Sequence, residues 1–216
     1  MKRFYAMLLL VFFACKIDEK KQIKTVDINA IPIQQINKLD SYFIDTKQSL
    51  IYWQGATLGK THNGSIFFNK GFFGIQNDSV IFANLEIDMH SIQNFDVTDE
   101  EKNAELIAHL KSSDFFDVEK FPFGRLKVQS SNYQMDSTGN ITRNVILELK
   151  GISQDQVISY KKASTDDAFR ITMSALKINR QLWNIHSKFT HPVAFAKDLM
   201  IQDTIILHAK IMALKK

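Results

Sequence analysis

From Tyr42 onward, apolar and polar residues alternate in several short stretches of the chain. The clearest stretch covers residues 85–90, where the sequence is LEIDMH. Successive side chains of a β-strand point to opposite faces, so this period of two predicts a strand with one buried face and one solvent-exposed face. The same alternation occurs three more times, with the apolar members Val145, Leu147 and Leu149; Phe169, Ile171 and Met173; and Ile205, Leu207, Ala209 and Ile211.

Turn-forming residues separate these stretches. The pair Asn77-Asp78 and the run DSTGN at residues 136–140 predict hairpin turns. Many short strands at close spacing indicate a mainly β fold, either a barrel or a sandwich. Five of the eight glycines predict further tight turns between neighbouring strands, and these are Gly55, Gly59, Gly64, Gly71 and Gly74.

One helix is predicted to interrupt the strands. Thr98 is a favourable N-cap, and Glu101 three residues later completes a capping box. Acidic residues in the first turn suit the positive end of the helix dipole, which explains this acidic cluster without a metal site. The apolar positions that follow have helical spacing and predict the face that packs on the strands: Ala104, Ile107, Ala108 and Leu110.

The N-terminal region lacks the strand pattern. Lys2 and Arg3 are basic, residues 4–13 are apolar, and Ala14 and Cys15 follow. This apolar run is about half the length that spans a bilayer as a helix, so it suits the core of a secretion signal. The position of the single cysteine resembles a lipoprotein signal, which implies that the processed chain begins at Cys15 with an acylated sulfur. We expect a signal peptide at 1–14, a lipidated N-terminus and flexible tether at 15–40, and one domain at 41–216.

The charge and the cysteine count limit the possible classes of protein. The formal net charge is +4, and loss of Lys2 and Arg3 with the signal leaves 25 basic and 23 acidic residues. These charges are interspersed, whereas nucleic-acid binding needs a concentrated basic surface. A single cysteine excludes an internal disulfide, so the core must stabilise the fold. The 17 phenylalanines, against 2 tryptophans and 5 tyrosines, indicate either extensive apolar packing or an apolar cavity.

The sequence carries no recognisable catalytic motif. It has neither a G-x-S-x-G nucleophile elbow nor a glycine-rich phosphate loop. His186 and His191 have a spacing found in some zinc sites, but no cysteine accompanies them. We therefore expect a protein that is not an enzyme and that uses neither a metal nor another cofactor.

Several motifs, taken in order, resemble the YceI-like family of lipocalin-like periplasmic proteins, which is associated with polyisoprenoid binding. The most specific is HLKSSDFFDVEKFP at 109–122. The others are THNGSI at 61–66, similar to a His-x-Gly turn that enters a strand, then IDMHSI at 87–92, INRQLWNI at 178–185 and DTIILHAKIMA at 203–213. The resemblance covers about residues 40–214. It implies an antiparallel barrel of about eight strands with the helix packed outside, and such a barrel can hold one small ligand or chain.

The resemblance also implies a ligand and a site for it. The ligand would be a long apolar, isoprenoid-like lipid, which the protein carries, stores or buffers in the bacterial cell envelope. The lipid anchor at Cys15 would hold the domain at a membrane, facing the periplasm or the cell surface. The residues predicted to line the lumen share parity within each run and have mostly polar neighbours: Ile66, Phe68, Leu85, Ile87, Met89, Leu147, Leu149, Ile171 and Met173.

Two alternatives give the same sequence pattern. A solid core would use the same alternation, and the protein would then be an envelope lipoprotein that binds other proteins and has no small-molecule ligand. An enzyme that uses the barrel as a reaction vessel would need a titratable pair converging on the lumen. We expect four aromatic residues to be structural and to pack the helix and a strand corner against the barrel: Phe115, Phe116, Phe121 and Trp183.

Overall fold

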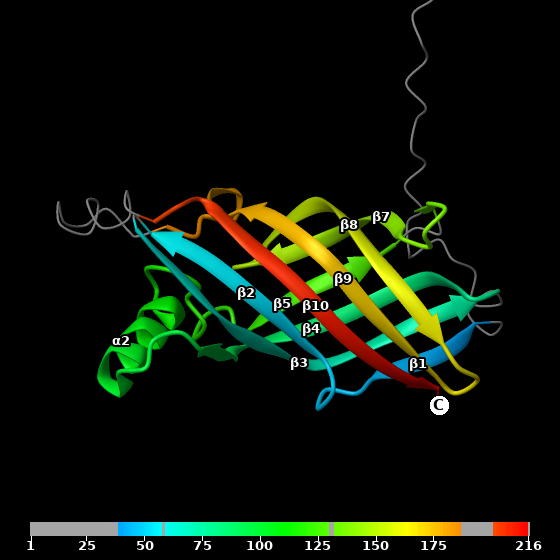
Figure 1. Cartoon of the computed structure of the whole chain (residues 1–216), viewed down its shortest axis with the longest axis horizontal. Helices are drawn as coiled ribbons and strands as arrows, with labels where there is room; N and C mark the ends of the chain where they lie inside the picture. Colours follow the sequence, from blue (N-terminus) through cyan, green and yellow to red (C-terminus); the bar gives the residue numbers. More distant parts are fainter. Residues whose placement is uncertain (1–38, 58, 130–131, 187–200, 216) are drawn as a thin grey trace, which may run out of the picture.

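The strands of the chain form one antiparallel sheet that closes on itself (Figure 1). A computed structural model describes residues 39–57, 59–129, 132–186 and 201–215. The elements in chain order are β1 (Asp40–Ile44), β2 (Leu50–Thr57), β3 (Lys60–Gln76), β4 (Ser79–Asn94), α2 (Glu100–Lys111), β5 (Phe123–Val128), β6 (Gln134–Met135), β7 (Ile141–Leu149), β8 (Ile152–Ser164), β9 (Ala168–Asn179), the 3-10 helix η2 (Arg180–Trp183) and β10 (Thr204–Lys215).

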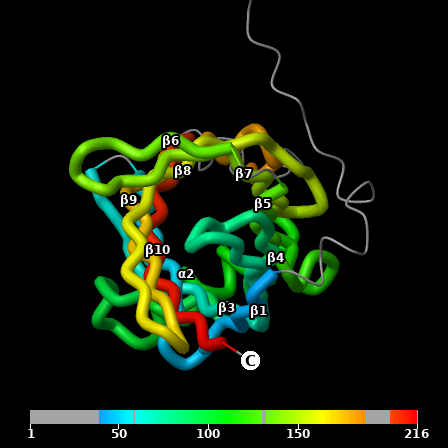
Figure 2. Tube along the Cα trace, turned by 90° about the vertical axis from the view of Figure 1, so that its right-hand side faces the viewer, coloured from blue at the N-terminus to red at the C-terminus, as the bar shows by residue number. Residues whose placement is uncertain are grey.

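The closed sheet is a barrel with eight strand positions. The order around the barrel is β2, β3, β4, β5, β7, β8, β9 and β10, and the pairing of β10 with β2 completes the ring. Strand β1 pairs with the same two neighbours as β2, namely β10 and β3, so β1 and β2 share one position. Figure 2 views the barrel from one end and shows the strands arranged in a ring. The predicted mainly β, antiparallel barrel of about eight strands is confirmed.

The break between β1 and β2 is fixed by hydrogen bonds to β10. The backbone N–H of Asp45 donates to the carbonyl of Met212 over 2.8 Å. The buried hydroxyl of Ser49 donates to the same carbonyl over 3.2 Å and accepts from the Met212 N–H over 2.9 Å. The backbone N–H and carbonyl of Met212 thus keep hydrogen-bond partners where the chain leaves the sheet between β1 and β2.

The predicted alternation of buried and outer side chains is confirmed in β4. Leu85, Ile87 and Met89 point into the barrel and are at most 3% exposed. Glu86 lies on the outer face, where Arg125 Nη2 is 3.8 Å from its carboxylate. Arg125 Nη1 also lies 2.7 Å from Glu148 on β7. Ionic contacts thus cross the outer face of the β4–β5–β7 region, while the inner face is apolar.

Both predicted hairpin turns are present. Asn77 and Asp78 have φ of 50° and 61° and connect β3 to β4, which suits a two-residue turn whose central residues both need positive φ. In the 136–140 turn the Asp136 carboxylate accepts hydrogen bonds from the backbone N–H groups of Thr138 and Asn140. Gly139 takes φ of 80° there.

The prediction that five glycines mark turns is wrong for most of them. Gly59 lies in the β2–β3 turn with φ of 82°, but Gly55 lies inside β2. Gly64, Gly71 and Gly74 lie inside β3, so the predicted His-x-Gly turn is part of a continuous strand. The physical reason is close approach rather than turning. A Cβ on Gly64 would lie 1.8 Å from the carbonyl oxygen of Gln93 on β4.

Gly64→Ala is therefore expected to destabilise the barrel. The added methyl group meets a backbone oxygen, which cannot rotate away, so β3 and β4 must separate locally. The cost should reach the upper part of the range for overpacking, about 3 kcal/mol. Gly55→Ala is the matched control, because a Cβ on Gly55 meets no atom within 4 Å. Chemical denaturation of both variants measures the difference, and equal stabilities would show that this approach is not a constraint.

Helix α2 lies outside the barrel at one end, as predicted (Figure 1), but two details of the helix prediction are wrong. The N-cap is Asp99 rather than Thr98, because the Asp99 carboxylate accepts from the N–H of Lys102 over 3.0 Å. The predicted apolar face is wrong in part, since Ala104 and Ala108 are exposed. Among the described residues, no helix combines the length and the apolar character needed to cross a membrane.

The corner after β9 is built by the motif at 178–185. Arg180 is 1% exposed, and its Nη1 donates to the carbonyl of Ile185 over 2.7 Å. Its Nη2 lies 3.2 Å from the Asp203 carboxylate, just before β10. Trp183 is fully buried and donates from Nε1 to the Leu147 carbonyl over 3.2 Å. These contacts bind the end of β9 to β7 and to the start of β10, in agreement with the structural role expected for Trp183.

Candidate functional site

The interior of the barrel is hollow. A cavity of about 230 Å³ lies inside, and its wall is almost wholly apolar. This volume is larger than the ~150 Å³ of an apolar cavity that stays dry and admits a benzene ring. The structure therefore does not support the alternative of a solid interior.

All nine residues predicted to line a lumen lie in the wall of this cavity. Each has its side chain on the inner face of its strand, because parity within a strand fixes the face. Contact with a ligand stays a prediction for all of them. By strand they are Ile66 and Phe68 on β3, Leu85, Ile87 and Met89 on β4, Leu147 and Leu149 on β7, and Ile171 and Met173 on β9.

The prediction missed the parts of the wall that β2, β5, β8, β10 and α2 supply. Strands β2 and β10 contribute Ile51, Trp53 and Ala209 among others. On β10 the alternation of apolar and polar residues was already visible in the sequence. On β8 two successive inward positions are glutamines, Gln154 and Gln156, which interrupt the apolar alternation. Phe115 and Phe116, which were expected to be structural, also line the cavity beneath α2, with their rings packed edge to face at 5.0 Å.

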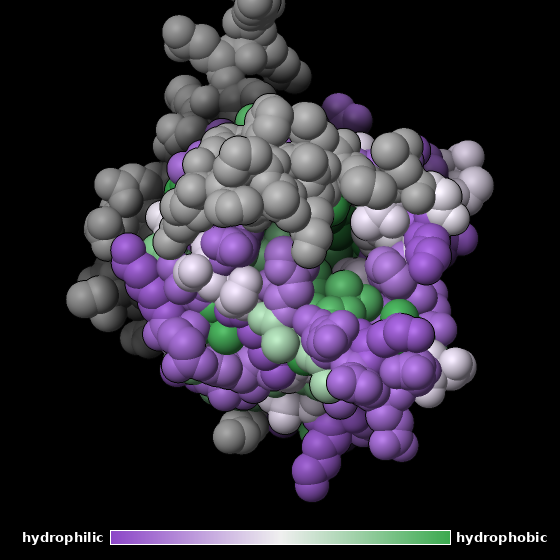
Figure 3. All heavy atoms as spheres, turned by 90° about the vertical axis from the view of Figure 1, so that its left-hand side faces the viewer, coloured by the Kyte–Doolittle hydropathy of each residue, from purple (hydrophilic) through white to green (hydrophobic). Residues whose placement is uncertain are grey.

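The cavity opens at the end of the barrel beside α2, which we call the mouth. Thr57, His62, His109 and Gln202 are the polar residues of the cavity wall at this end. Figure 3 views this end and shows hydrophobic side chains in a depression, with hydrophilic ones at its sides and below it. An apolar interior with a polar rim is the usual form of a small-molecule site.

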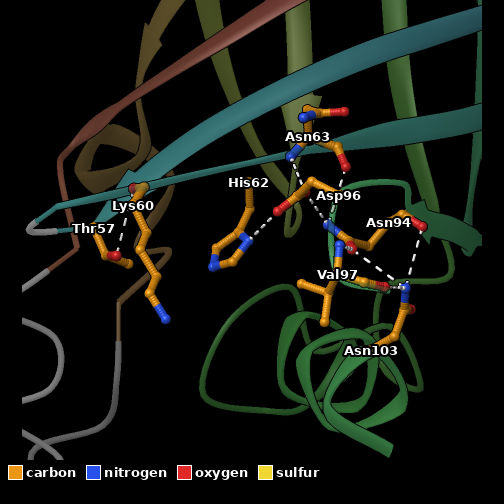
Figure 4. A network of polar contacts seen from close by, with 8 residues as sticks. All are labelled: Thr57, Lys60, His62, Asn63, Asn94, Asp96, Val97 and Asn103. Atoms are coloured by element: carbon orange, nitrogen blue, oxygen red, sulfur yellow. Dashed lines mark hydrogen bonds and ion pairs between the residues drawn. The ribbon is translucent and has the colours of Figure 1, made fainter. Parts of the chain in front are cut away.

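The side chains of His62 and Asp96 form a hydrogen bond at the mouth (Figure 4). His62 Nδ1 lies 2.8 Å from one oxygen of Asp96, and the other oxygen accepts from the Asn63 N–H over 2.8 Å. Burial opposes ionisation of Asp96, but the hydrogen bonds from Asn63, His62 and Asn94 outweigh it and hold the pKa of this carboxyl below its usual value. Asp96 is therefore ionised at neutral pH and gives the mouth a fixed negative charge.

The same network attaches α2 to the barrel. Asn94, at the end of β4, donates to Asp96 over 2.7 Å, and its own carbonyl group accepts from the side chain of Asn103 on α2. Asn103 also donates to the Val97 carbonyl over 2.7 Å. Figure 4 shows these side chains connecting the β3–β4 edge to the helix. The helix is thus fixed beside the mouth by specific hydrogen bonds as well as by apolar contacts.

The opposite end of the cavity, which we call the closed end, is filled by aromatic rings. Tyr42, Phe73 and Phe169 are buried there, and the Phe169 ring lies 5.0 Å from each of the other two. The polar side chains of the cavity wall at this end are Arg143 and Tyr160. The lumen is therefore an apolar tube with polar groups at both ends.

His62 is a titratable side chain in the cavity wall at the mouth. The His62 ring has an orienting carboxylate, but within the described ranges no hydroxyl or thiol forms a hydrogen bond to it. No group of three or more metal-binding side chains occurs in the part of the chain that the structure describes. His191, one member of the spaced histidine pair, lies outside the described residues, as does Cys15.

A sequence model of the YceI-like domain matches residues 42–213 of the chain. No curated protein matches the chain. Solved structures that are similar in fold include the following three. BcnA from Burkholderia cenocepacia is 14% identical, with a TM-score of 0.61, and the match covers 78% of this chain and 98% of that one.

The second structure is a polyisoprenoid binding domain from Saccharophagus degradans, implicated in plant cell wall breakdown. It is 13% identical with a TM-score of 0.56, and the match covers 83% of this chain and 100% of that one. The third is the YceI protein of Campylobacter jejuni, 16% identical with a TM-score of 0.50, with 95% and 99% of the two chains covered. At these identities the likeness shows a shared fold.

Proposed function

The chain belongs to the YceI-like domain family, and from this premise we propose that its barrel binds a long apolar, isoprenoid-like lipid. The observation that carries the proposal is the cavity of about 230 Å³ with an apolar wall and a mouth at one end. The name of the Saccharophagus degradans domain, which has the same fold, supports the choice of ligand class. We propose a binding protein rather than an enzyme.

The energetics of an apolar chain in water favour such a cavity. Burial of one CH₂ group is worth about 0.8 kcal/mol, so a five-carbon isoprenoid unit gains roughly 4 kcal/mol on leaving water. The cavity offers an environment similar to a bilayer interior, so transfer from a membrane into it can be nearly balanced. A protein of this kind can therefore move such a lipid through water without a prohibitive barrier.

The test is to purify the chain from the envelope of a producing bacterium and identify the lipids that co-purify by mass spectrometry. The delipidated protein is then titrated with farnesol, and the fluorescence of Trp53, which lines the cavity, reports entry of the chain. Trp53→Phe removes this signal and identifies its source. Repeated purification without lipid, together with no response to farnesol, would contradict the proposal.

We further propose that the protein is exported and anchored in the cell envelope by a lipid on Cys15. The anchor would raise the local concentration of donor lipid near the barrel. Metabolic labelling with a fatty-acid analogue is expected to mark the wild type and not Cys15→Ser, because Cys15 is the only cysteine. Immunoblotting controls for equal expression. Label on the serine variant would exclude this site of acylation.

A further inference from the structure

We propose that the closed end of the cavity binds an anionic end group of the ligand, held by Arg143 and Tyr160, with the apolar chain of the ligand extending toward the mouth. This inference rests on the proposed function and specifies the ligand further: an amphiphile with a terminal carboxylate or phosphate. Both residues belong to the cavity wall, and each is only 3% exposed.

Arg143 and Tyr160 are arranged to act on one group. Arg143 Nη1 donates to the Tyr160 hydroxyl over 3.4 Å and to the Val80 carbonyl over 2.8 Å. These bonds fix the guanidinium at the closed end, beside the start of β4. A guanidinium carries five N–H donors in one plane and can meet two oxygens of a carboxylate or phosphate at once. The tyrosine hydroxyl can turn to donate to the same anion.

The surroundings strengthen an interaction with an anion at this end. The cavity wall next to Arg143 is apolar, and Phe73 and Phe169 exclude water from the end of the barrel. Charges attract one another more strongly in such a medium than in water, and charged hydrogen bonds are the strongest of their kind. Lys162, the neighbouring cation, is paired with Asp78 at the β3–β4 turn.

The mouth is less suited to the same group. Its histidine, His62, is already paired with Asp96, and the two side chains are 23% and 27% exposed. An anion placed there would meet the Asp96 carboxylate and the screening effect of water. Charge complementarity therefore favours the closed end for the anionic group and the mouth for the free end of the apolar chain.

The experiment compares three probes with the same fifteen-carbon chain: farnesol, farnesoic acid and farnesyl monophosphate. Isothermal titration of the purified wild-type chain is expected to give at least about tenfold tighter binding of one or both anions than of the alcohol. The two anions distinguish a carboxylate ligand from a phosphate ligand. Farnesol binding without any preference for the anions overturns this inference and leaves the proposed function standing, whereas no binding of any probe contradicts both.

Variants identify the residues. Arg143→Met keeps an unbranched, flexible side chain without the charge and should abolish the preference for anions while farnesol still binds. Arg143→Lys should restore part of the preference, and Tyr160→Phe should reduce it severalfold. Arg170→Met is the matched control, because Arg170 is exposed on β9. A preference that survives Arg143→Met overturns the assignment. If Arg143→Met does not fold, an unchanged preference in Tyr160→Phe overturns it.

Discussion

Trp183→Ala is expected to lower the free energy of unfolding by about 3 to 5 kcal/mol, the range for loss of a large buried aromatic side chain. Trp183 is fully buried in the corner after β9, so the truncation leaves a void that the corner cannot fill. It also leaves the Leu147 carbonyl without the indole N–H that lies 3.2 Å away. For a domain of this size the melting temperature should fall by roughly 6 to 20 °C.

The neighbouring Leu182 provides the control for this prediction. Its side chain is 49% exposed, so Leu182→Ala should change stability little. Trp183→Phe keeps most of the apolar volume and loses the hydrogen bond, so it should cost about 1 to 2 kcal/mol. Equal melting temperatures for Trp183→Ala and Leu182→Ala would mean that the corner does not hold the barrel together.

Ala209→Phe is expected to reduce farnesol affinity at least about tenfold without lowering the melting temperature. Ala209 is 4% exposed on β10 and lies in the cavity wall between Ile51 and Met173. In a hollow interior the added ring occupies the space of the ligand and buries more apolar surface. In a solid core the same change would cost about 1 to 3 kcal/mol through overpacking.

Ala175→Phe is the matched control, because Ala175 is exposed on β9. This variant places the same ring outside the barrel and should bind farnesol as the wild type does. Thermal melting and titration of both variants separate the two kinds of interior. An Ala209→Phe protein that melts well below the wild type and binds farnesol normally would contradict a ligand in this cavity.

The alternation with period two was sufficient to predict which side chains face the interior. It could not show whether side chains from opposite walls of the barrel touch each other. Leu147 and Leu149 were placed correctly because a strand has only two faces. Whether the opposite walls touch depends on the barrel radius, which follows from the number of strands and their stagger. That property belongs to the closed sheet and is absent from any single stretch of sequence.

Arg143 lines the cavity but was not among the residues predicted to do so. It has the parity of Val145, Leu147 and Leu149, so continuing the alternation by one step would have placed it in the cavity wall. A charged residue at such a position usually ends a strand prediction. The prediction that the glycines of β3 mark turns was wrong for a different reason. Glycine is favoured both in turns and where two backbones approach closely, and only the neighbouring strand distinguishes the two uses.

The position of β1 determines at which end of the barrel the chain enters the sheet. Asp40 lies opposite Ile75, near the β3–β4 turn at the closed end, whereas His62 lies at the mouth. The stretch of β3 from residue 62 to residue 75 spans about 40 Å at 3.3 Å per residue. The N-terminal segment therefore joins the barrel at the closed end. If Cys15 is acylated, as we propose, the lipid anchor is attached through the closed end of the barrel, opposite the mouth.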